Sequence, residues 1–68
     1  MTLEEFKELP YGTKVVYTYI HPRSGKTLSE VREFGYIGAT GRVILYEEGE
    51  RNMQDAIAVN PEKVTLLA

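Results

Sequence analysis

Apolar and polar residues alternate along this chain in short stretches that are separated by turn-forming residues. The longest uninterrupted apolar stretches have four residues, as at 43–46, and they are rich in β-branched and aromatic side chains. Short stretches of this composition, bounded by glycine, proline and asparagine, are typical of β-strands. The pattern predicts five short strands, over residues 13–20, 31–37, 42–47, 56–59 and 64–67.

The stretch 13–20 is the strongest strand prediction, because nearly every residue in it favours β-structure. Successive side chains of a strand point to opposite faces of the sheet. The two predicted faces carry Val15, Tyr17 and Tyr19 on one side and Val16, Thr18 and Ile20 on the other. Since both faces are partly apolar, the pattern indicates a sheet that curls on itself or uses one face for binding.

A short helix is predicted over residues 2–9. Thr2 and Glu5 have the spacing of a capping box, in which the Thr2 hydroxyl accepts a hydrogen bond from the Glu5 backbone and the Glu5 carboxylate accepts one from the Thr2 backbone. The apolar residues of the helix are Leu3, Phe6 and Leu9. Because an isolated helix of this length is marginal in water, we expect it to cover an open end of the sheet.

Glycines mark the sharpest bend of the predicted sheet. Gly35, Gly38 and Gly41 are three residues apart and precede the apolar stretch 43–46. Glycine adopts positive φ, or lets another backbone approach closely, without steric cost. We therefore interpret this segment as a strand, a glycine-rich bend and a second strand.

Polar turns connect the remaining strands. Residues 21–30 contain proline, glycine and several hydroxyl and charged groups, which predicts an exposed loop or an irregular hairpin with Ser24 and Gly25 at its tip. Residues 48–52 form another predicted turn. Residues 60–63 predict a turn, or a single 3₁₀ turn, before the last strand.

The order of these elements resembles an SH3-like small β-barrel, with a long polar loop after the first of five strands. The corner Gly38-x-x-Gly41-x-Val43 is similar to the glycine pattern of the KOW segment in ribosomal and transcription-elongation barrels. Residues 59–67 resemble the final turn and strand of many such barrels. These motifs occur in several families, so the resemblance implies a fold class and no particular activity.

The resemblance implies an all-β chain with one domain over residues 1–68, in which a short capping helix (2–9) precedes a five-stranded SH3-like barrel (13–67). Ala39 and Thr40 stand where a KOW segment often has basic residues, which weakens a ribosomal or RNA-binding role. The chain has no tryptophan, and its long loop is basic. Peptide-binding SH3 domains use tryptophan and an acidic loop for proline-rich ligands, so this type of ligand is a minor hypothesis.

Charge is distributed unevenly, although the net charge is only −2. Residues 13–46 hold five basic and two acidic side chains, a balance of +3, whereas the rest of the chain holds three basic and eight acidic ones, a balance of −5. An ordinary mixed surface is the favoured account of this distribution. The alternative is a basic loop that faces an acidic partner or phosphates.

The composition excludes several classes of protein. The chain has no cysteine, so it has no disulfide framework, thiolate zinc site or thiol nucleophile. Its apolar stretches are far shorter than the roughly 20 residues that span a bilayer, and its first residues are acidic. We expect a soluble, cytoplasmic protein with no membrane partner.

The inventory of reactive side chains predicts no enzymatic activity and no catalytic, cofactor-binding or metal-binding residues. His21 is the only histidine, and a solvated position at the end of a strand explains it. Glu47, Glu48 and Glu50 lack the alternating oxygen ligands of a calcium loop and are typical of a polar turn. Residues 24–27 superficially resemble the end of a phosphate-binding loop, but the upstream glycine and the following helix are missing.

Binding by a surface is therefore the favoured function, and the five tyrosines are its first candidates. Tyr17, Tyr36 and Tyr46 are expected to pack in the core. Tyr11 and Tyr19 are expected at strand ends near the basic loop. The predicted partner-binding residues are Tyr11, Tyr19, His21, Arg23, Lys26 and Arg32.

Three hypotheses follow. The first is a non-enzymatic accessory module, monomeric or weakly homo-oligomeric, that docks onto a protein partner through Tyr19 and the basic loop. The alternative is a nucleic-acid-binding barrel in which Tyr17 or Tyr19 stacks on bases and the loop neutralises phosphates, although the net acidity of the chain counts against it. A third is homo-oligomerisation through an unsheltered edge strand such as 56–59.

Overall fold

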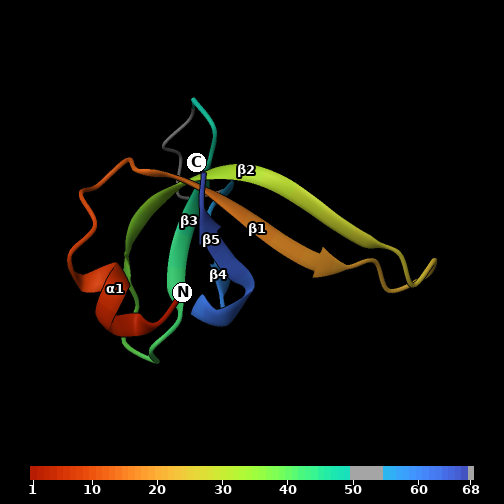
Figure 1. Cartoon of the computed structure of the whole chain (residues 1–68), viewed down its shortest axis with the longest axis horizontal. Coiled ribbons are helices and arrows are strands. Elements are labelled where there is room, and N and C mark those ends of the chain that lie inside the picture. Colours follow the sequence, from red (N-terminus) through yellow and green to blue (C-terminus); the bar gives the residue numbers. More distant parts are fainter. Residues whose placement is uncertain (50–54, 68) are drawn as a thin grey trace.

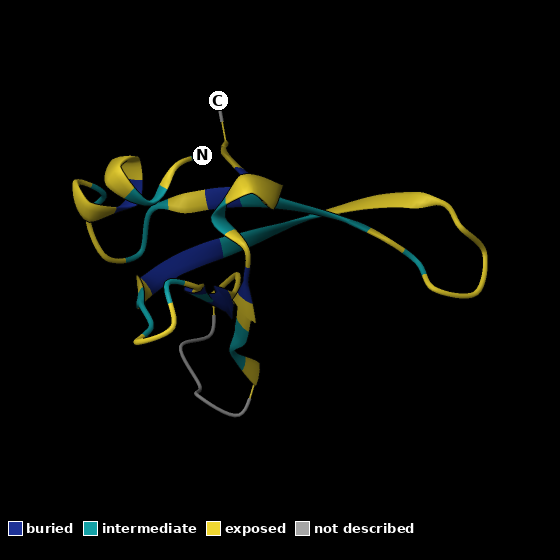
Figure 2. Cartoon of the chain, turned by 90° about the horizontal axis from the view of Figure 1, so that it is seen from below, coloured by how far each residue is buried: buried dark blue, intermediate teal, exposed yellow. Residues whose placement is uncertain are grey.

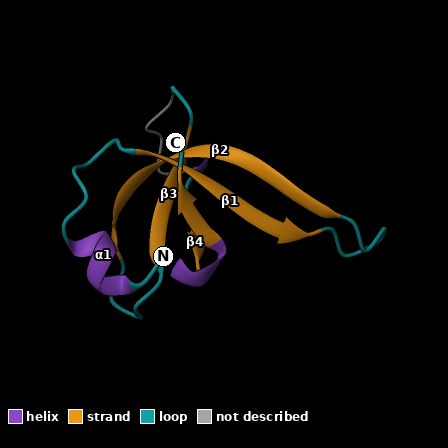
Figure 3. Cartoon of the chain, viewed as in Figure 1, coloured by secondary structure: helices purple, strands orange, loops and turns teal. Residues whose placement is uncertain are grey.

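The chain folds into a five-stranded antiparallel sheet with one short α-helix (Figures 1 and 3). The computed structural model describes residues 1–49 and 55–67. The elements are α1 (Leu3–Lys7), β1 (Lys14–Ile20), β2 (Thr27–Ile37), β3 (Val43–Glu47), β4 (Ile57–Val59), the 3₁₀ helix η2 (Pro61–Lys63) and β5 (Val64–Leu66). The predicted all-β class and the five strands are confirmed. Part of the predicted turn at 48–52 lies outside the described residues.

The strands follow the order β4-β3-β2-β1-β5. Each neighbouring pair is antiparallel, and β5 returns to pair with β1, over Val15–Tyr17. Among the described residues, β4 and β5 each have a partner on one side only, so the sheet is open between them. The sheet is therefore all antiparallel and strongly bent, and it is not closed into a barrel.

Helix α1 begins at the predicted capping box. The backbone N–H of Glu5 donates to the Thr2 hydroxyl at 3.3 Å, and the backbone N–H of Thr2 donates to the Glu5 carboxylate at 2.9 Å. The pKa of Glu5 is lowered below its usual 4.5, first by this bond from the Thr2 backbone and second by the Thr2 hydroxyl, which donates to the same carboxylate at 3.2 Å. Phe6 is fully buried, with its ring centroid 5.2 Å from that of Phe34 on β2. The predicted docking of the helix is confirmed, over five residues instead of eight.

The core lies on one face of the bent sheet, beneath α1. Cross-strand pairing explains its composition, because the pairs Phe34↔Leu45 and Val43↔Val59 point to the same side of the sheet. The buried core consists of Phe6, Val15, Phe34, Val43, Leu45, Val59 and Val64. Every strand contributes at least one side chain, so the core connects all five strands.

The bend in β2 is at Gly35, as the glycine spacing predicted. The register between β2 and β3 shifts between Phe34 and Tyr36, which leaves Gly35 as the extra residue of a β-bulge. The ring of Tyr46 lies against Gly35, and a Cβ at this position would collide with it. The turn after β2 is closed by Gly41, at φ +83°. The glycines are therefore explained by the bend of the sheet.

The β1–β2 hairpin extends far beyond the core, and we call residues 18–29 the arm (Figures 1 and 2). Strand β5 pairs with β1 no further than Tyr17, and β3 pairs with β2 only from Arg32 onward. The arm therefore pairs only with itself, through the register that ends at Ile20↔Thr27. We call the remaining described residues the body.

The predicted exposed segment 21–30 is a shorter loop than expected. Strand β2 begins at Thr27, so residues 27–30 form a strand and only 21–26 form the loop. The tip at Ser24 and Gly25 is confirmed, since Gly25 adopts φ +70°. The hairpin alternative is thus confirmed, and only the start of the strand, predicted at 31, was wrong. Residues 27–30 have no core beneath them, and strands without a buried face lack the apolar alternation on which the prediction depends.

Candidate protein-docking surface

The arm presents aromatic and aliphatic side chains on a two-stranded ribbon. The rings of Tyr17 and Tyr19 stack on the core-facing side, with centroids 5.2 Å apart and planes 17° from parallel. Leu28 is the cross-strand partner of Tyr19. Ile20, on the opposite side, is 62% exposed, the highest value among the large apolar residues that are exposed in the described chain. The arm thus carries apolar surface away from the core.

The tip of the arm is a turn whose backbone is hydrogen-bonded to His21. The His21 backbone N–H donates to the Lys26 carbonyl at 2.8 Å. The His21 Nδ1 accepts the backbone N–H groups of Arg23 at 3.2 Å and of Ser24 at 3.3 Å. The His21 ring therefore caps the turn by accepting from two successive backbone N–H groups. Its ring orders the loop that presents Arg23 and Lys26.

Arg23 and Lys26 are exposed on this turn. In the described part of the chain the ion pairs are Lys7 with Glu4, Lys14 with Glu48 and Arg32 with Glu30. Neither tip cation belongs to these pairs. Their positive charge is therefore available to a partner, and the ordered turn keeps the two cations at the end of the arm.

The structure places Tyr11 and Arg32 away from the tip. Tyr11 lies at the opposite end of β1, about 23 Å along a strand of seven residues. Its ring contacts Tyr46 edge-on, with centroids 6.1 Å apart. The Arg32 side chain is only 12% exposed and donates from Nε to Glu30 at 2.9 Å. The six predicted residues thus form one group on the arm, Tyr19, His21, Arg23 and Lys26, and two separate positions.

The remaining tyrosines occupy three different environments. Tyr46 is buried, and Tyr17 is half-buried against the core, as expected. Tyr36 is 43% exposed, contrary to the expectation that it packs in the core. The bulge at Gly35 explains the difference, because it shifts the alternation so that Ile37, and not Tyr36, shares the core face with Phe34.

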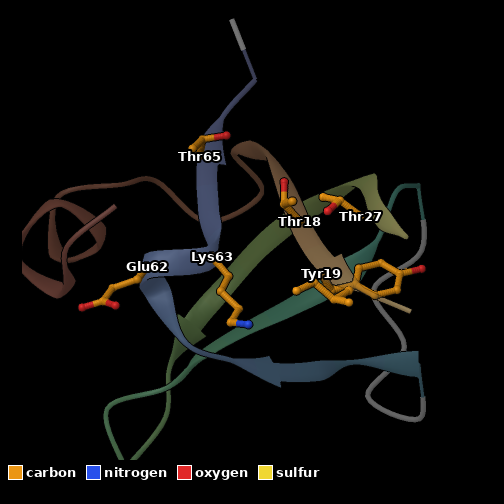
Figure 4. A pocket seen from close by; sticks show the side chains of 7 residues that line it. Thr18, Tyr19, Thr27, Glu62, Lys63 and Thr65 are labelled. Atoms are coloured by element: carbon orange, nitrogen blue, oxygen red, sulfur yellow. The ribbon is translucent and has the colours of Figure 1, made fainter. Parts of the chain in front are cut away.

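A groove of about 330 Å³ separates the arm from η2 (Figure 4). Its lining residues are Thr18, Tyr19, Ile20, Thr27, Glu62, Lys63 and Thr65. The side chains of Glu62 and Lys63 point apart, so Lys63 extends into the groove without Glu62 beside it. Of these residues only Tyr19 was a sequence candidate. The others carry no distinctive motif, and their proximity depends on how β5 returns to β1.

The described residues contain no cluster of metal-ligating side chains. No group of three or more histidine, cysteine, aspartate or glutamate side chains is placed to hold a metal ion there. Glu48 forms an ion pair with Lys14 at 3.0 Å, and Glu50 lies outside the described residues. The absence of enzymatic activity stays a prediction.

Comparison with known proteins gives no assignment. No family model, no curated protein and no solved structure matches this chain. In residues 1–49 and 55–67, no helix is long and apolar enough to cross a membrane.

Proposed function

We propose that this chain is a non-enzymatic binding module that docks onto a protein partner through its arm, residues 18–29. The observation that carries the proposal is the arm itself, a ribbon that leaves the body with exposed apolar residues and an ordered basic tip. We further propose that the body belongs to the SH3-like small barrels. The strand order, the return of β5 to β1 and the 3₁₀ helix before β5 support this assignment.

The energetics of the arm support a role in binding. A two-stranded hairpin that packs on nothing is marginally stable in water. Ile20 and Leu28 expose apolar surface to water. Burying this surface against a partner would stabilise the complex by about 25 cal/mol for each Å². Exposed apolar patches rimmed by polar residues are typical of interaction sites. A partner that covers the arm explains why the chain extends it.

Protein is a better partner than nucleic acid for this surface. The tip offers two cations on a chain whose net charge is −2, and binding to nucleic acid depends on neutralising several phosphates. The Tyr19 ring is already stacked on Tyr17, so one of its faces is occupied and does not receive a base. These observations favour an acidic protein surface that meets a few charges together with apolar contacts.

Charge reversal at the tip tests the proposal. The double variant Arg23→Glu/Lys26→Glu should capture at least about tenfold less of the partner than the wild type does. The amount captured from cell lysate is quantified by mass spectrometry. The matched control Lys7→Glu/Arg42→Glu makes the same change in net charge on the body, and it should capture the partner like the wild type. Equal capture by all three proteins would contradict the proposal.

A fluorescence polarisation assay with a random single-stranded oligonucleotide distinguishes protein docking from the alternative function, nucleic-acid binding. We expect weak binding at low salt that the tip substitutions barely alter. Tight binding that falls steeply with salt and disappears in Arg23→Glu/Lys26→Glu would favour the nucleic-acid function instead.

A further inference from the structure

The β1 edge of the arm has main-chain groups that no strand of the described chain pairs with. In an antiparallel ladder, alternate residues direct their N–H and C=O groups to the same neighbour. His21 N donates to Lys26 O, and Phe34 N donates to Thr13 O, so the odd-numbered residues of β1 bond to β2. The even-numbered residues face the other edge, where Lys14 O accepts from Leu67 N.

Strand β5 uses only part of this edge. Its pairing with β1 ends at Tyr17↔Val64, and η2 then carries the chain away. By the same alternation, the N–H and C=O groups of Thr18 and Ile20 point to the edge of β1 with which β5 pairs. They lie beyond the last paired residue, Tyr17, so β5 does not reach them. This is the side on which the groove of about 330 Å³ lies, between the arm and Lys63. The edge and the groove together form an open strand position.

The charges around this position select its occupant. A strand that lies antiparallel to β1, like every neighbour in this sheet, runs in the direction of β5. Its first residues then lie near Arg23 and Lys26 at the tip, and its last residues lie near Lys63. In the described part of the chain, the ion pairs involve none of these three cations. Acidic residues at both ends of an extended peptide complement this arrangement.

We propose that an acidic, extended segment of a partner protein adds to the β1 edge of the arm as an antiparallel strand, hydrogen-bonded to Thr18 and Ile20. This inference rests on the proposed docking function and specifies how the partner is held. Main-chain hydrogen bonds supply affinity in strand addition, and flanking side chains supply specificity. The groove beside η2 receives the side chains of the added strand that point toward the body.

Two proline variants on opposite edges of the arm provide a matched test. Thr18→Pro removes the N–H on the β1 edge, and Ser29→Pro removes one on the β2 edge. Thr18 and Ser29 are cross-strand partners whose hydroxyls lie 3.1 Å apart, so both variants lose the same side-chain hydrogen bond. Both residues direct their main-chain groups outward, so neither proline removes a bond between β1 and β2.

The probe is a display library of random peptides of about eight residues, selected against the full chain, with the enriched peptides then synthesised with a fluorophore. We expect acidic, β-branched peptides. Thr18→Pro should weaken their binding about five- to tenfold, and Ser29→Pro by less than about twofold. On the wild-type protein, N-methylation of the peptide should abolish binding at every second amide only. This readout needs no altered protein.

Several results would overturn strand addition: no enriched peptide, equal effects of the two prolines, or N-methylation effects without alternation. A dimer that Thr18→Pro converts to monomer would place a second copy on the edge instead, and displacement of the peptide by an oligonucleotide would assign the tip to phosphates. Partner capture then separates the two proposals. If one of these results is found but Arg23→Glu/Lys26→Glu still abolishes partner capture, strand addition is wrong and the docking function stands. If these substitutions leave partner capture unchanged, the docking function is wrong as well.

Discussion

Strands β1 and β2 run through both the body and the arm, but only the body has a core. Val15 and Phe34 lie in the stretches of β1 and β2 that α1, β3, β4 and β5 surround, and both are buried. Ile20, at the end of β1, and Leu28, near the start of β2, lie in the arm and are exposed. A ladder of backbone hydrogen bonds therefore continues past the point where burial stops. The comparison shows that packing stabilises the body, whereas the arm is held by its ladder and its tip.

Two leucines on neighbouring strands should show the largest difference between the regions. Leu45 in the body is 0% exposed and Leu28 in the arm is 37% exposed. Leu45→Ala should reduce the free energy of unfolding by about 2–5 kcal/mol, because it leaves a cavity in the core. Leu28→Ala should reduce it by less than about 1 kcal/mol. Urea unfolding measures both, and equal losses would contradict the division into body and arm.

Two glycines extend the comparison from side chains to the backbone. Gly35→Ala should destabilise the body by about 1–3 kcal/mol, because the new Cβ collides with the Tyr46 ring. Gly25 in the arm adopts φ +70° with open space around it, so Gly25→Ala should cost only about 1 kcal/mol, from the backbone conformation. If Tyr46→Ala does not reduce the cost of Gly35→Ala in a double-mutant cycle, the steric account of the bend is wrong.

Hydrogen exchange should separate the regions without a substitution. The backbone N–H of Val15 should exchange only on global unfolding, since it is surrounded by the core. The backbone N–H of Tyr19 bonds across the arm to Leu28 and should exchange at least about tenfold faster, through local opening. Equal protection measured by NMR would mean that the arm opens only with the body.

The smallest effect concerns the pH dependence of the helix cap. The folded-state pKa of Glu5 is lowered, so its contribution to stability is present above the unfolded pKa and is lost as pH falls through the folded one. A slight loss of stability is expected as the pH falls below 4.5, the usual value of this group. Thermal unfolding of Glu5→Gln should lack that part of the slope. An identical slope in both proteins would exclude Glu5 as its source.

The sequence was most informative where side chains are buried. Alternation over 13–20 predicted the face that carries Val15 and Tyr17, and the glycine spacing predicted the bend at Gly35. The capping box predicted the start of α1. Each of these depends on interactions between residues that are close in sequence, or on a core that imposes a period.

The same reasoning was less informative for the candidate site. The position of Tyr36 depends on the bulge, which shifts the alternation by one residue. The groove depends on where β5 ends against β1, and it joins Thr18 to Lys63 across a large sequence separation. No local pattern records where a strand pairing stops. The candidate site therefore became visible only with the topology of the sheet.

The most direct test of the account is to remove the arm. Replacing residues 18–29 by Asn-Gly joins Tyr17 to Glu30, which are cross-strand partners, through a two-residue turn that suits a hairpin. We predict that this protein keeps its free energy of unfolding within about 1 kcal/mol, because the core is untouched, and loses capture of the protein partner. An unfolded product, or a folded one that captures the partner like the wild type, would contradict the claim that the body is a scaffold and the arm is its docking surface.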